Sequence, residues 1–244
     1  MVAFVEREVI IAAPSAIPIS LSAVSFNSEH YHSELFHQLG ISRPSKLLHS
    51  IDKRCSDYLA GRIAAKAAIS HSQKPFPKLD SSLQVNCSRE GAPIFPCGFV
   101  GSISHSGNFA MAAVSKGNHL SSIGIDIEQT IPEEDYELVK RQVLTHDEVP
   151  LLEQLSITNN VALTLIFSAK ESLFKCLHPE IKRFFDFTAA KVIAVDQFTN
   201  DKHGWSSFTI ELLETLSECL SKGRRFTGFY RHYLEHIITL IVRH

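Results

Sequence analysis

The sequence lacks an excess of basic residues and lacks any long apolar run. Its 244 residues include 24 Lys and Arg against 26 Asp and Glu, a formal net charge of −2. Nucleic-acid-binding chains normally carry a strong basic excess, so we expect no nucleic-acid partner. No stretch approaches the roughly twenty apolar residues of a membrane span, and Glu6, Arg7 and Glu8 interrupt the place of a signal peptide's apolar core. We therefore expect a cytoplasmic protein without a membrane span.

The sequence also lacks the common motifs of disulfide, zinc and nucleotide-hydrolase proteins. Its cysteines are odd in number, and none forms a C-x-x-C pair; they are Cys55, Cys87, Cys97, Cys176 and Cys219. We therefore expect reduced thiols and neither a disulfide framework nor a zinc site. No H-E-x-x-H helix accompanies His30, His32 and His37, and no G-x-x-x-x-G-K-[ST] loop occurs.

What is present indicates an ordinary globular protein of mixed helices and strands. The hydrophobic fraction is 44% and the charged fraction is 20%, and the length allows one large domain or two of half the size. A helix is predicted from Ser45 to Ser70, with a buried line of Leu47, Ile51, Cys55, Leu59 and Ile63. Further helices are predicted at 136–143, 147–155 and 160–177, and Thr145 with Glu148 predicts a capping box. Strands are predicted at 83–88, 99–104, 108–115, 121–128, 189–195, 205–213, 225–232 and 236–242, with a Gly117-Asn118 turn.

Two segments carry acidic residues in patterns that suggest a site. From Ile123 to Glu128, isoleucines alternate with Gly124, Asp126 and Glu128, so an extended strand places both acids on one face. In Phe167–Lys175, Glu171 and Lys175 are spaced to share one face of a helix.

If that helix lies beside that strand, Asp126, Glu128 and Glu171 converge. Three hard oxygen donors suit Mg²⁺, which points to phosphate chemistry. The alternatives are a solvated strand end and a surface salt bridge.

A third segment, Gly101–Gly107, reads G-S-I-S-H-S-G and surrounds His105 with small and hydroxylated residues. Such a turn offers backbone N–H groups, hydroxyls and an imidazole to a phosphate. Taken alone, a single histidine near a turn is more often structural.

The order of G-S-I-S-H-S, I-G-I-D-I-E and F-S-A-K-E-S-x-x-K resembles the 4′-phosphopantetheinyl transferases, in particular the two-halved bacterial type associated with siderophore and nonribosomal peptide synthesis. Leu59–Ala65 and Ala162–Leu165 are similar to the enterobactin synthase component D subgroup. The similarity covers residues 50–178 and, more faintly, 237–242. Residues 1–45 and 180–235 carry no motif of the family.

The resemblance implies an α+β fold of two pseudo-symmetric α/β-sandwich halves with the active site at their junction. Residues 1–118 would form the N-terminal half, which binds coenzyme A phosphates. Residues 119–244 would form the C-terminal half, with the metal-binding carboxylates and the catalytic helix. A monomer is expected, because a two-halved chain supplies both sides of the cleft.

The resemblance also implies a reaction and residue roles. The enzyme would transfer 4′-phosphopantetheine from coenzyme A to a serine of an apo carrier protein and release 3′,5′-ADP. Asp126, Glu128 and Glu171 would bind Mg²⁺, although Mn²⁺ has the same ligand preference. Glu171 would accept the serine proton and Lys175 would neutralise the departing phosphate. Ser104 and His105 would bind a pyrophosphate oxygen, while the role of Lys170 is open.

Basic residues of the first predicted helix are candidates for holding coenzyme A. Arg54, Tyr58, Arg62 and Lys66 recur every four residues, and Arg54 and Arg62 are the candidates for its phosphates. The alternative is a solvated basic face. The chain departs from the family in reading Gly91-Ala92-Pro93 where many members have G-K-P, so Ala92 cannot supply the lysine contact and Arg89 is a nearby substitute.

The carrier partner has several possible identities. Likeness to the enterobactin subgroup favours aryl and peptidyl carrier domains of a siderophore synthetase, while fatty-acid or polyketide acyl carriers are alternatives. Two further alternatives are a non-catalytic subunit that docks carrier proteins and a Mg²⁺-dependent nucleotide hydrolase.

Overall fold

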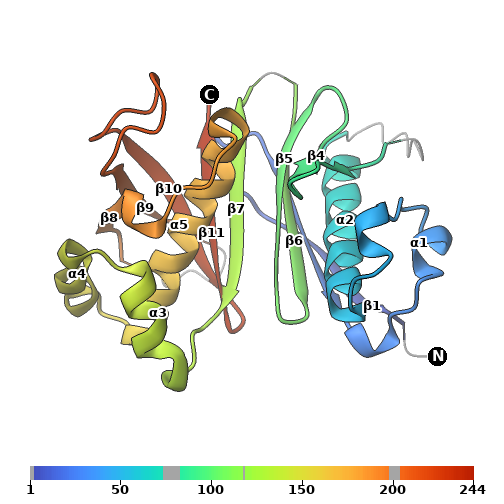
Figure 1. Ribbon diagram of the computed structural model, residues 1–244, viewed down its shortest axis with the longest axis horizontal. Helices are drawn as coiled ribbons and strands as arrows, with labels where there is room; N and C mark the ends of the chain where they lie inside the picture. Colours follow the sequence, from blue (N-terminus) through green and yellow to red (C-terminus); the bar gives the residue numbers. More distant parts are fainter. Residues whose placement is uncertain (1–2, 74–82, 118, 198–203) are drawn as a thin grey trace. The chain divides into compact units, whose positions relative to one another are not determined.

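The computed structural model describes residues 3–73, 83–117, 119–197 and 204–244. The chain packs as two compact units, Met1–Ile123 with His244 and Gly124–Arg243. In each unit a long helix covers a mainly antiparallel sheet (Figure 1), so the expected mixture of helix and sheet is confirmed. The pseudo-symmetry of the halves and an active site at their junction stay predictions. Within the described ranges, no helix is long and apolar enough to cross a membrane.

The N-terminal unit is built on a four-stranded sheet in the order β1-β2-β6-β5. Its strands are β1 (Val5–Ile11), β2 (Ser20–Phe26), β5 (Phe99–Ser106) and β6 (Phe109–Lys116). Shorter elements are η1 (Ser28–His30), α1 (Leu35–Gln38), η2 (Ser45–Leu47), β3 (Asn86–Cys87) and β4 (Pro93–Ile94). The strands β1 and β2 lie in the segment where the sequence contains no family motif, and we had predicted neither.

Helix α2 (Asp52–Ser72) packs on β2 and β6. It begins after Ile51, which is extended and 73% exposed, so the predicted start at Ser45 and the predicted burial of Ile51 are wrong. Cys55 and Leu59 are buried as predicted. Small side chains dominate its inner face, which lets the helix lie close to the sheet; they are Ala60, Gly61, Ala64, Ala65 and Ala68.

The C-terminal unit is built on a five-stranded sheet in the order β7-β11-β10-β9-β8. Its strands are β7 (Ser122–Gln129), β8 (Ala190–Val195), β9 (Ser206–Leu212), β10 (Arg225–Tyr233) and β11 (His236–Arg243). Helix α5 (Asn159–Ile181) packs on β11 and β8, and the unit's hydrophobic core lies between them. The other helical elements are η3 (Glu133–Asp135), α3 (Tyr136–Val143), η4 (His146–Glu148), α4 (Val149–Gln154) and η5 (Phe187–Ala189).

Short sequence patterns predicted the positions of the C-terminal helices closely. The capping box of Thr145 and Glu148 is confirmed, although the element after it divides into η4 and α4. Helix α5 continues through Pro179, which has no N–H to donate to the carbonyl four residues earlier, and stops two residues later at Ile181. Its C-cap residue, Lys182, adopts the left-handed conformation. The break that Pro75 and Pro77 predict at 71–82 after the first helix, and the predicted Gly117-Asn118 turn, include residues outside the described ranges.

One close approach holds α5 against β7. A Cβ atom added to Gly124 would lie 1.8 Å from the carbonyl oxygen of Ser172 and 2.6 Å from the backbone nitrogen of Cys176. Both atoms belong to the backbone of α5 and cannot rotate away. Only glycine at this strand position therefore lets the helix lie where it does.

We predict that Gly124→Ala lowers the free energy of unfolding by about 1–3 kcal/mol or more, because the methyl group overpacks this contact. Gly61→Ala is the comparison, since its added Cβ would meet a side-chain methyl group, Cγ2 of Ile103 at 2.8 Å, and no backbone atom of the sheet. Its cost should be smaller than that of Gly124→Ala, because a side chain can shift more readily than a helix backbone and alanine is the better helix former. Chemical denaturation measures both, and equal losses would show that the backbone contact at Gly124 is not special.

Candidate active site

Asp126 is the central carboxylate of the candidate site. It lies on β7 with 1% of its surface exposed. Its Oδ1 atom accepts a hydrogen bond from Lys175 Nζ at 2.6 Å, and its Oδ2 atom accepts one from Ser168 Oγ at 2.7 Å. Ser168 and Lys175 lie about two turns apart on α5. The acidic face of the strand therefore does meet the helix.

The hydroxyl of Ser168 has a second polar neighbour, the hydroxyl of Thr239. Ser168 Oγ and Thr239 Oγ1 are 2.9 Å apart, and Thr239 Oγ1 donates to the Ser168 carbonyl at 2.8 Å. Thr239 belongs to β11, the strand beside β7. We had not selected either residue from the sequence, although Ser168 stands inside the F-S-A-K-E-S segment and Thr239 inside the weakly similar terminal strand.

Glu171 lies one turn before Lys175 on α5 and is mostly shielded from solvent. Burial raises the pKa of its carboxyl above the ordinary value; the ammonium of Lys175 opposes the increase and the carboxylate of Asp126 adds to it. Glu171, Lys175 and Asp126 thus form one electrostatic group. A carboxylate with a raised pKa is a better proton acceptor than an ordinary one.

The donor chemistry of this group fits a hard divalent cation, since Asp126 and Glu171 both offer carboxylate oxygens. Glu128 is half-buried on β7, and strand alternation places it on the face of Asp126. Among the residues that the structure describes, however, no three His, Cys, Asp or Glu side chains are grouped closely enough to hold a metal ion. The three-carboxylate site stays a prediction.

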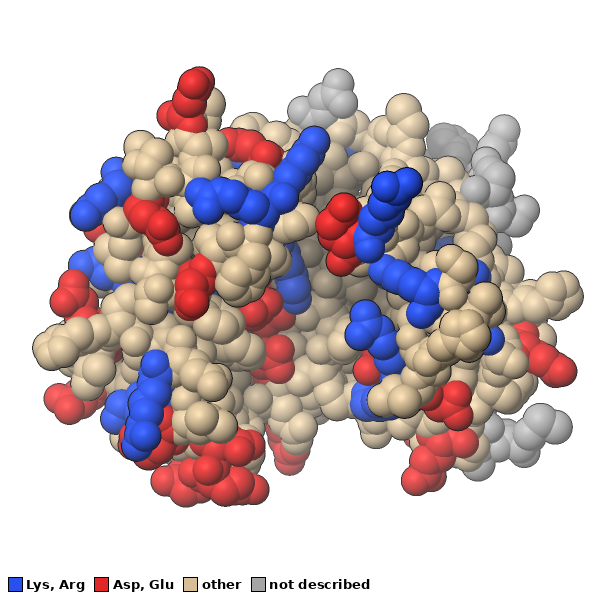
Figure 2. Space-filling model, viewed as in Figure 1, with Lys and Arg blue, Asp and Glu red and all other residues tan. Residues whose placement is uncertain are grey.

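Burial separates these carboxylates from the ordinary surface acids of the same unit. Figure 2 shows acidic side chains gathered over η3 and α3. The acidic residues of these two elements are fully exposed; they are Glu133, Glu134, Asp135 and Glu137. Such charges are screened by water, so they interact weakly compared with the shielded Asp126 and Glu171.

A pocket of about 220 Å³ opens beside Glu171. Aromatic side chains dominate its lining, and Phe174 makes ring contacts with Phe184 at 5.7 Å and Phe185 at 5.2 Å. Its full lining is Lys170, Glu171, Leu173, Phe174, Phe184, Phe185, Asp186, Phe187 and Ala190. Residues 184–187, which lie in the part of the sequence without a family motif, therefore form one wall of this pocket.

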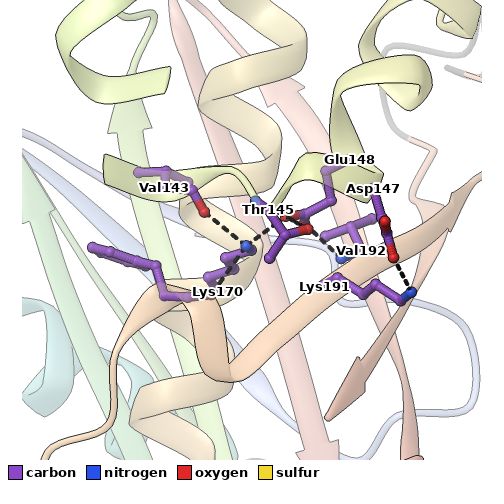
Figure 3. A network of polar contacts seen from close by, with 8 residues as sticks. Val143, Thr145, Asp147, Glu148, Lys170, Lys191 and Val192 are labelled. Atoms are coloured by element: carbon purple, nitrogen blue, oxygen red, sulfur yellow. Dashed lines mark hydrogen bonds and ion pairs between the residues drawn. The ribbon is translucent and has the colours of Figure 1, made fainter. Parts of the chain in front are cut away.

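Lys170, the motif lysine without a predicted role, lines this pocket, and its buried ammonium belongs to a polar network (Figure 3). Its ammonium lies 2.7 Å from Glu148 Oε2, the same glutamate that caps η4. Burial lowers the pKa of Lys170 and the charge of Glu148 opposes the decrease. Lys170 thus points away from Lys175, because a residue five positions further along a helix is turned by about 140° around its axis.

The N-terminal candidates lie on a different unit. His105 is exposed on β5, and its Nδ1 atom is 4.0 Å from Asp57 Oδ2 of α2. Lys53 Nζ lies 2.5 Å from Asp57 Oδ1 and donates to the carbonyl of Gly107 at 2.9 Å. The turn after β5 is therefore tied to the start of α2, where Arg54 is exposed. Ser104 is buried on β5.

Arg62 has a structural environment that the sequence did not indicate. It is buried, donates to the carbonyls of Val85 at 2.9 Å and Asn86 at 3.2 Å, and stacks on Tyr58 at 4.0 Å. Burial lowers the pKa of its guanidinium. These contacts join α2 to the segment before β3. Binding of a coenzyme phosphate by Arg62 stays a prediction, and the exposed Arg54 is the more accessible of the two.

Comparison with known proteins agrees with the residue pattern. The model of the 4′-phosphopantetheinyl transferase N-terminal domain matches residues 43–115. The model of the 4′-phosphopantetheinyl transferase superfamily matches residues 122–225, which include β7 and α5. The matched ranges thus contain every candidate residue named above except Thr239.

Three curated relatives indicate how far the similarity extends. 4′-phosphopantetheinyl transferase Npt of Nocardia iowensis is 30% identical over 169 residues, covering 67% of this chain and 70% of that protein. Enterobactin synthase component D of Salmonella typhi is 28% identical over 195 residues, covering 80% and 77%. The protein of the same name from Escherichia coli (strain K12) is 36% identical over 132 residues, covering 54% and 58%, little more than half its length.

The chain belongs to the 4′-phosphopantetheinyl transferase superfamily, and it is a transferase. The family resemblance of the three motifs is thereby confirmed.

We predict that Glu171 titrates above the usual glutamate range in metal-free protein, and that Lys175→Met raises its pKa further because a stabilising cation is removed. Carbon-detected NMR of labelled glutamate side chains in the presence of EDTA measures this titration. Lys191→Met is the control, because Lys191 pairs with the exposed Asp147 at 2.7 Å. A Glu171 pKa unaffected by Lys175→Met would contradict the proposed electrostatic group.

Proposed function

We propose that this protein transfers the 4′-phosphopantetheine arm of coenzyme A to a serine hydroxyl of an apo carrier protein. The serine oxygen forms a bond to the β-phosphorus, the bond from that phosphorus to the bridging oxygen breaks, and 3′,5′-ADP leaves. The observation that carries the proposal is the group of Asp126, Glu171 and Lys175 on β7 and α5, within a chain of the transferase superfamily.

The roles of these residues follow from their charge and burial. Glu171, a shielded carboxylate one turn before Lys175, accepts the proton of the serine hydroxyl. Lys175, 25% exposed and one turn further along α5, presents its charge to the departing nucleotide phosphate. Ser168 and Thr239 orient Asp126 by hydrogen bonding.

A divalent cation completes the proposed site. We assign Asp126, Glu128 and Glu171 as its carboxylate ligands and Mg²⁺ as the ion, although Mn²⁺ takes the same donors. Bound there, the ion would screen the negative charge of the pyrophosphate. The support is the donor type and the electrostatic interaction of Asp126 with Glu171.

Coenzyme A has an uncharged pantetheine arm and charged phosphates, and we assign these to different residues of the chain. We place its pantetheine arm, which is largely uncharged, in the aromatic pocket beside Glu171. We place its phosphates with the N-terminal candidates Arg54, Ser104 and His105. The support for this second placement is that Arg54 and His105 are exposed cationic or ionisable groups and that residues 43–115 match the family's N-terminal domain.

The curated relatives support siderophore or other nonribosomal peptide synthesis as the pathway, since several carry the name enterobactin synthase component D. Aryl and peptidyl carrier domains are therefore the proposed partners. Fatty-acid or polyketide acyl carriers are the alternative substrates, and a monomer is the expected assembly. The acid–lysine group disfavours a carrier-docking subunit without catalytic activity.

Intact-protein mass spectrometry tests the reaction. An apo peptidyl carrier domain incubated with the protein, coenzyme A and Mg²⁺ should gain one phosphopantetheine, because both substrates of the proposed transfer and its metal ion are present. EDTA should prevent the gain. Aryl and acyl carriers tested in parallel identify the preferred partner. Folded protein that modifies none of them would contradict the transfer reaction.

We predict that Asp126→Asn reduces transfer at least about a hundredfold, because the central carboxylate charge is lost while its shape remains. The asparagine can still accept from Ser168, and Lys175 can turn to water, so the circular dichroism spectrum should be unchanged. Asp147→Asn removes an exposed carboxylate of the same unit and should transfer at the normal rate. Undiminished transfer by Asp126→Asn would remove Asp126 from the catalytic group.

A further inference from the structure

The pair of Lys170 and Glu148 is fully withdrawn from water. The exposed side-chain fractions are 2% for Lys170 and 0% for Glu148, and Nζ lies 2.7 Å from Oε2. Burying two charges is costly unless every polar atom finds a partner. A buried ion pair directly beside the proposed base therefore needs an explanation from its surroundings.

Glu148 is saturated with hydrogen-bond donors. Its Oε2 atom accepts from the backbone nitrogen of Thr145 at 2.8 Å and from Thr145 Oγ1 at 2.9 Å, as well as from Lys170. Its Oε1 atom accepts from the backbone nitrogen of Val192 at 2.7 Å. One carboxylate thus joins η4 to β8 (Figure 3).

The ammonium of Lys170 is equally saturated. It donates to Glu148, to the carbonyl of Val143 at 2.8 Å and to the carbonyl of Phe187 at 3.0 Å. An ammonium has three N–H donors, so none remains for a phosphate. We call Lys170 and Glu148, with these hydrogen bonds, the clamp, because the pair joins backbone segments of the protein.

The bond to Phe187 links this clamp to the pocket. Phe184–Phe187, the segment that ends at Phe187, forms the wall facing Glu171 and Phe174. This segment lies between α5 and β8, outside both. Phe184 is 72% exposed, so apolar burial alone holds that end of the wall weakly. The Lys170–Phe187 hydrogen bond fixes the other end.

We propose that Lys170, held by Glu148, is a positioning residue that fixes the wall Phe184–Phe187 beside Glu171. It acts on the shape of the pocket through the Phe187 carbonyl, and its ammonium, with all three N–H groups bonded to protein oxygens, does not bind the substrate. The role of the wall in binding the pantetheine arm rests on the proposed function. The dependence of the wall on Lys170 and Glu148 is argued from the hydrogen bonds alone.

The test uses three variants of the full chain: Lys170→Met, Glu148→Gln and the two combined. Each single variant leaves one buried charge without its partner, so both should be less stable than the parent. The double variant removes both charges at similar volume and should recover much of the loss. The double variant still lacks a donor for the Phe187 carbonyl. It therefore distinguishes a local loss of order in the wall from a loss of stability of the whole protein.

Limited trypsin digestion measures local opening of the wall, because the exposed Lys182 and Arg183 directly precede it. In the double variant, cleavage after these residues should be about tenfold faster, the effect of losing one charge-assisted hydrogen bond. Cleavage after Arg225, at the start of β10, monitors general unfolding and should stay near the parental rate. Asp147→Asn, which breaks the exposed pair with Lys191, is the matched control and should not change either rate.

Transfer kinetics add a second readout. A loosened wall should raise the KM for coenzyme A about tenfold with a smaller change in kcat, and Glu148→Gln should show the same split as Lys170→Met. Lys170→Met with lost turnover beside Glu148→Gln with normal kinetics would instead make Lys170 a substrate contact and overturn the proposal. A double variant with parental cleavage at 182 and 183 would also overturn it. The digestion shows whether the wall depends on the clamp even if the protein modifies no carrier.

Discussion

The contact of α5 with β7 at Gly124 is the constraint on which the candidate site depends. With the helix backbone against a residue that has no side chain, the next inward-facing position of the strand, Asp126, lies within hydrogen-bond distance of Ser168 and Lys175. A larger residue at 124 would displace the helix and separate these groups. The distance between strand and helix is therefore a condition of the chemistry as well as of the fold.

Burial then determines the electrostatic character of the group. In water, two carboxylates and an ammonium would interact weakly, but shielding strengthens each interaction. The raised pKa of Glu171 combines burial and the charge of Asp126 against the charge of Lys175. The same residues on the exposed surface of α3 would have near-ordinary proton affinities. The hydrophobic core under α5 thus contributes to the raised pKa of Glu171 by excluding solvent.

Sequence patterns predicted the parts of the molecule whose determinants are local. Strand alternation at Ile123–Glu128 and helical spacing at Glu171 and Lys175 predicted which side chains share a face. The capping box predicted the start of η4. The strands β1 and β2 were missed because their segment carries no family motif, and because β2 joins the sheet through β6, which is distant in sequence. The contacts of Arg62 with Val85 and Asn86 were missed because these residues lie 23 and 24 positions further along the chain.

Adjacent residues of one motif perform different tasks because a helix directs them about 100° apart. Glu171 faces the pocket and the charges of Asp126 and Lys175, whereas Lys170 donates to Glu148 and to the backbone carbonyls of Val143 and Phe187. A sequence motif records both residues without distinguishing their directions. The donors of Lys170 make the distinction: with all three N–H groups bonded to protein oxygens, its charge serves the shape of the site. Two consecutive residues of α5 thus differ in role: Glu171 belongs to the group with Asp126 and Lys175, and Lys170 belongs to the network that supports the pocket.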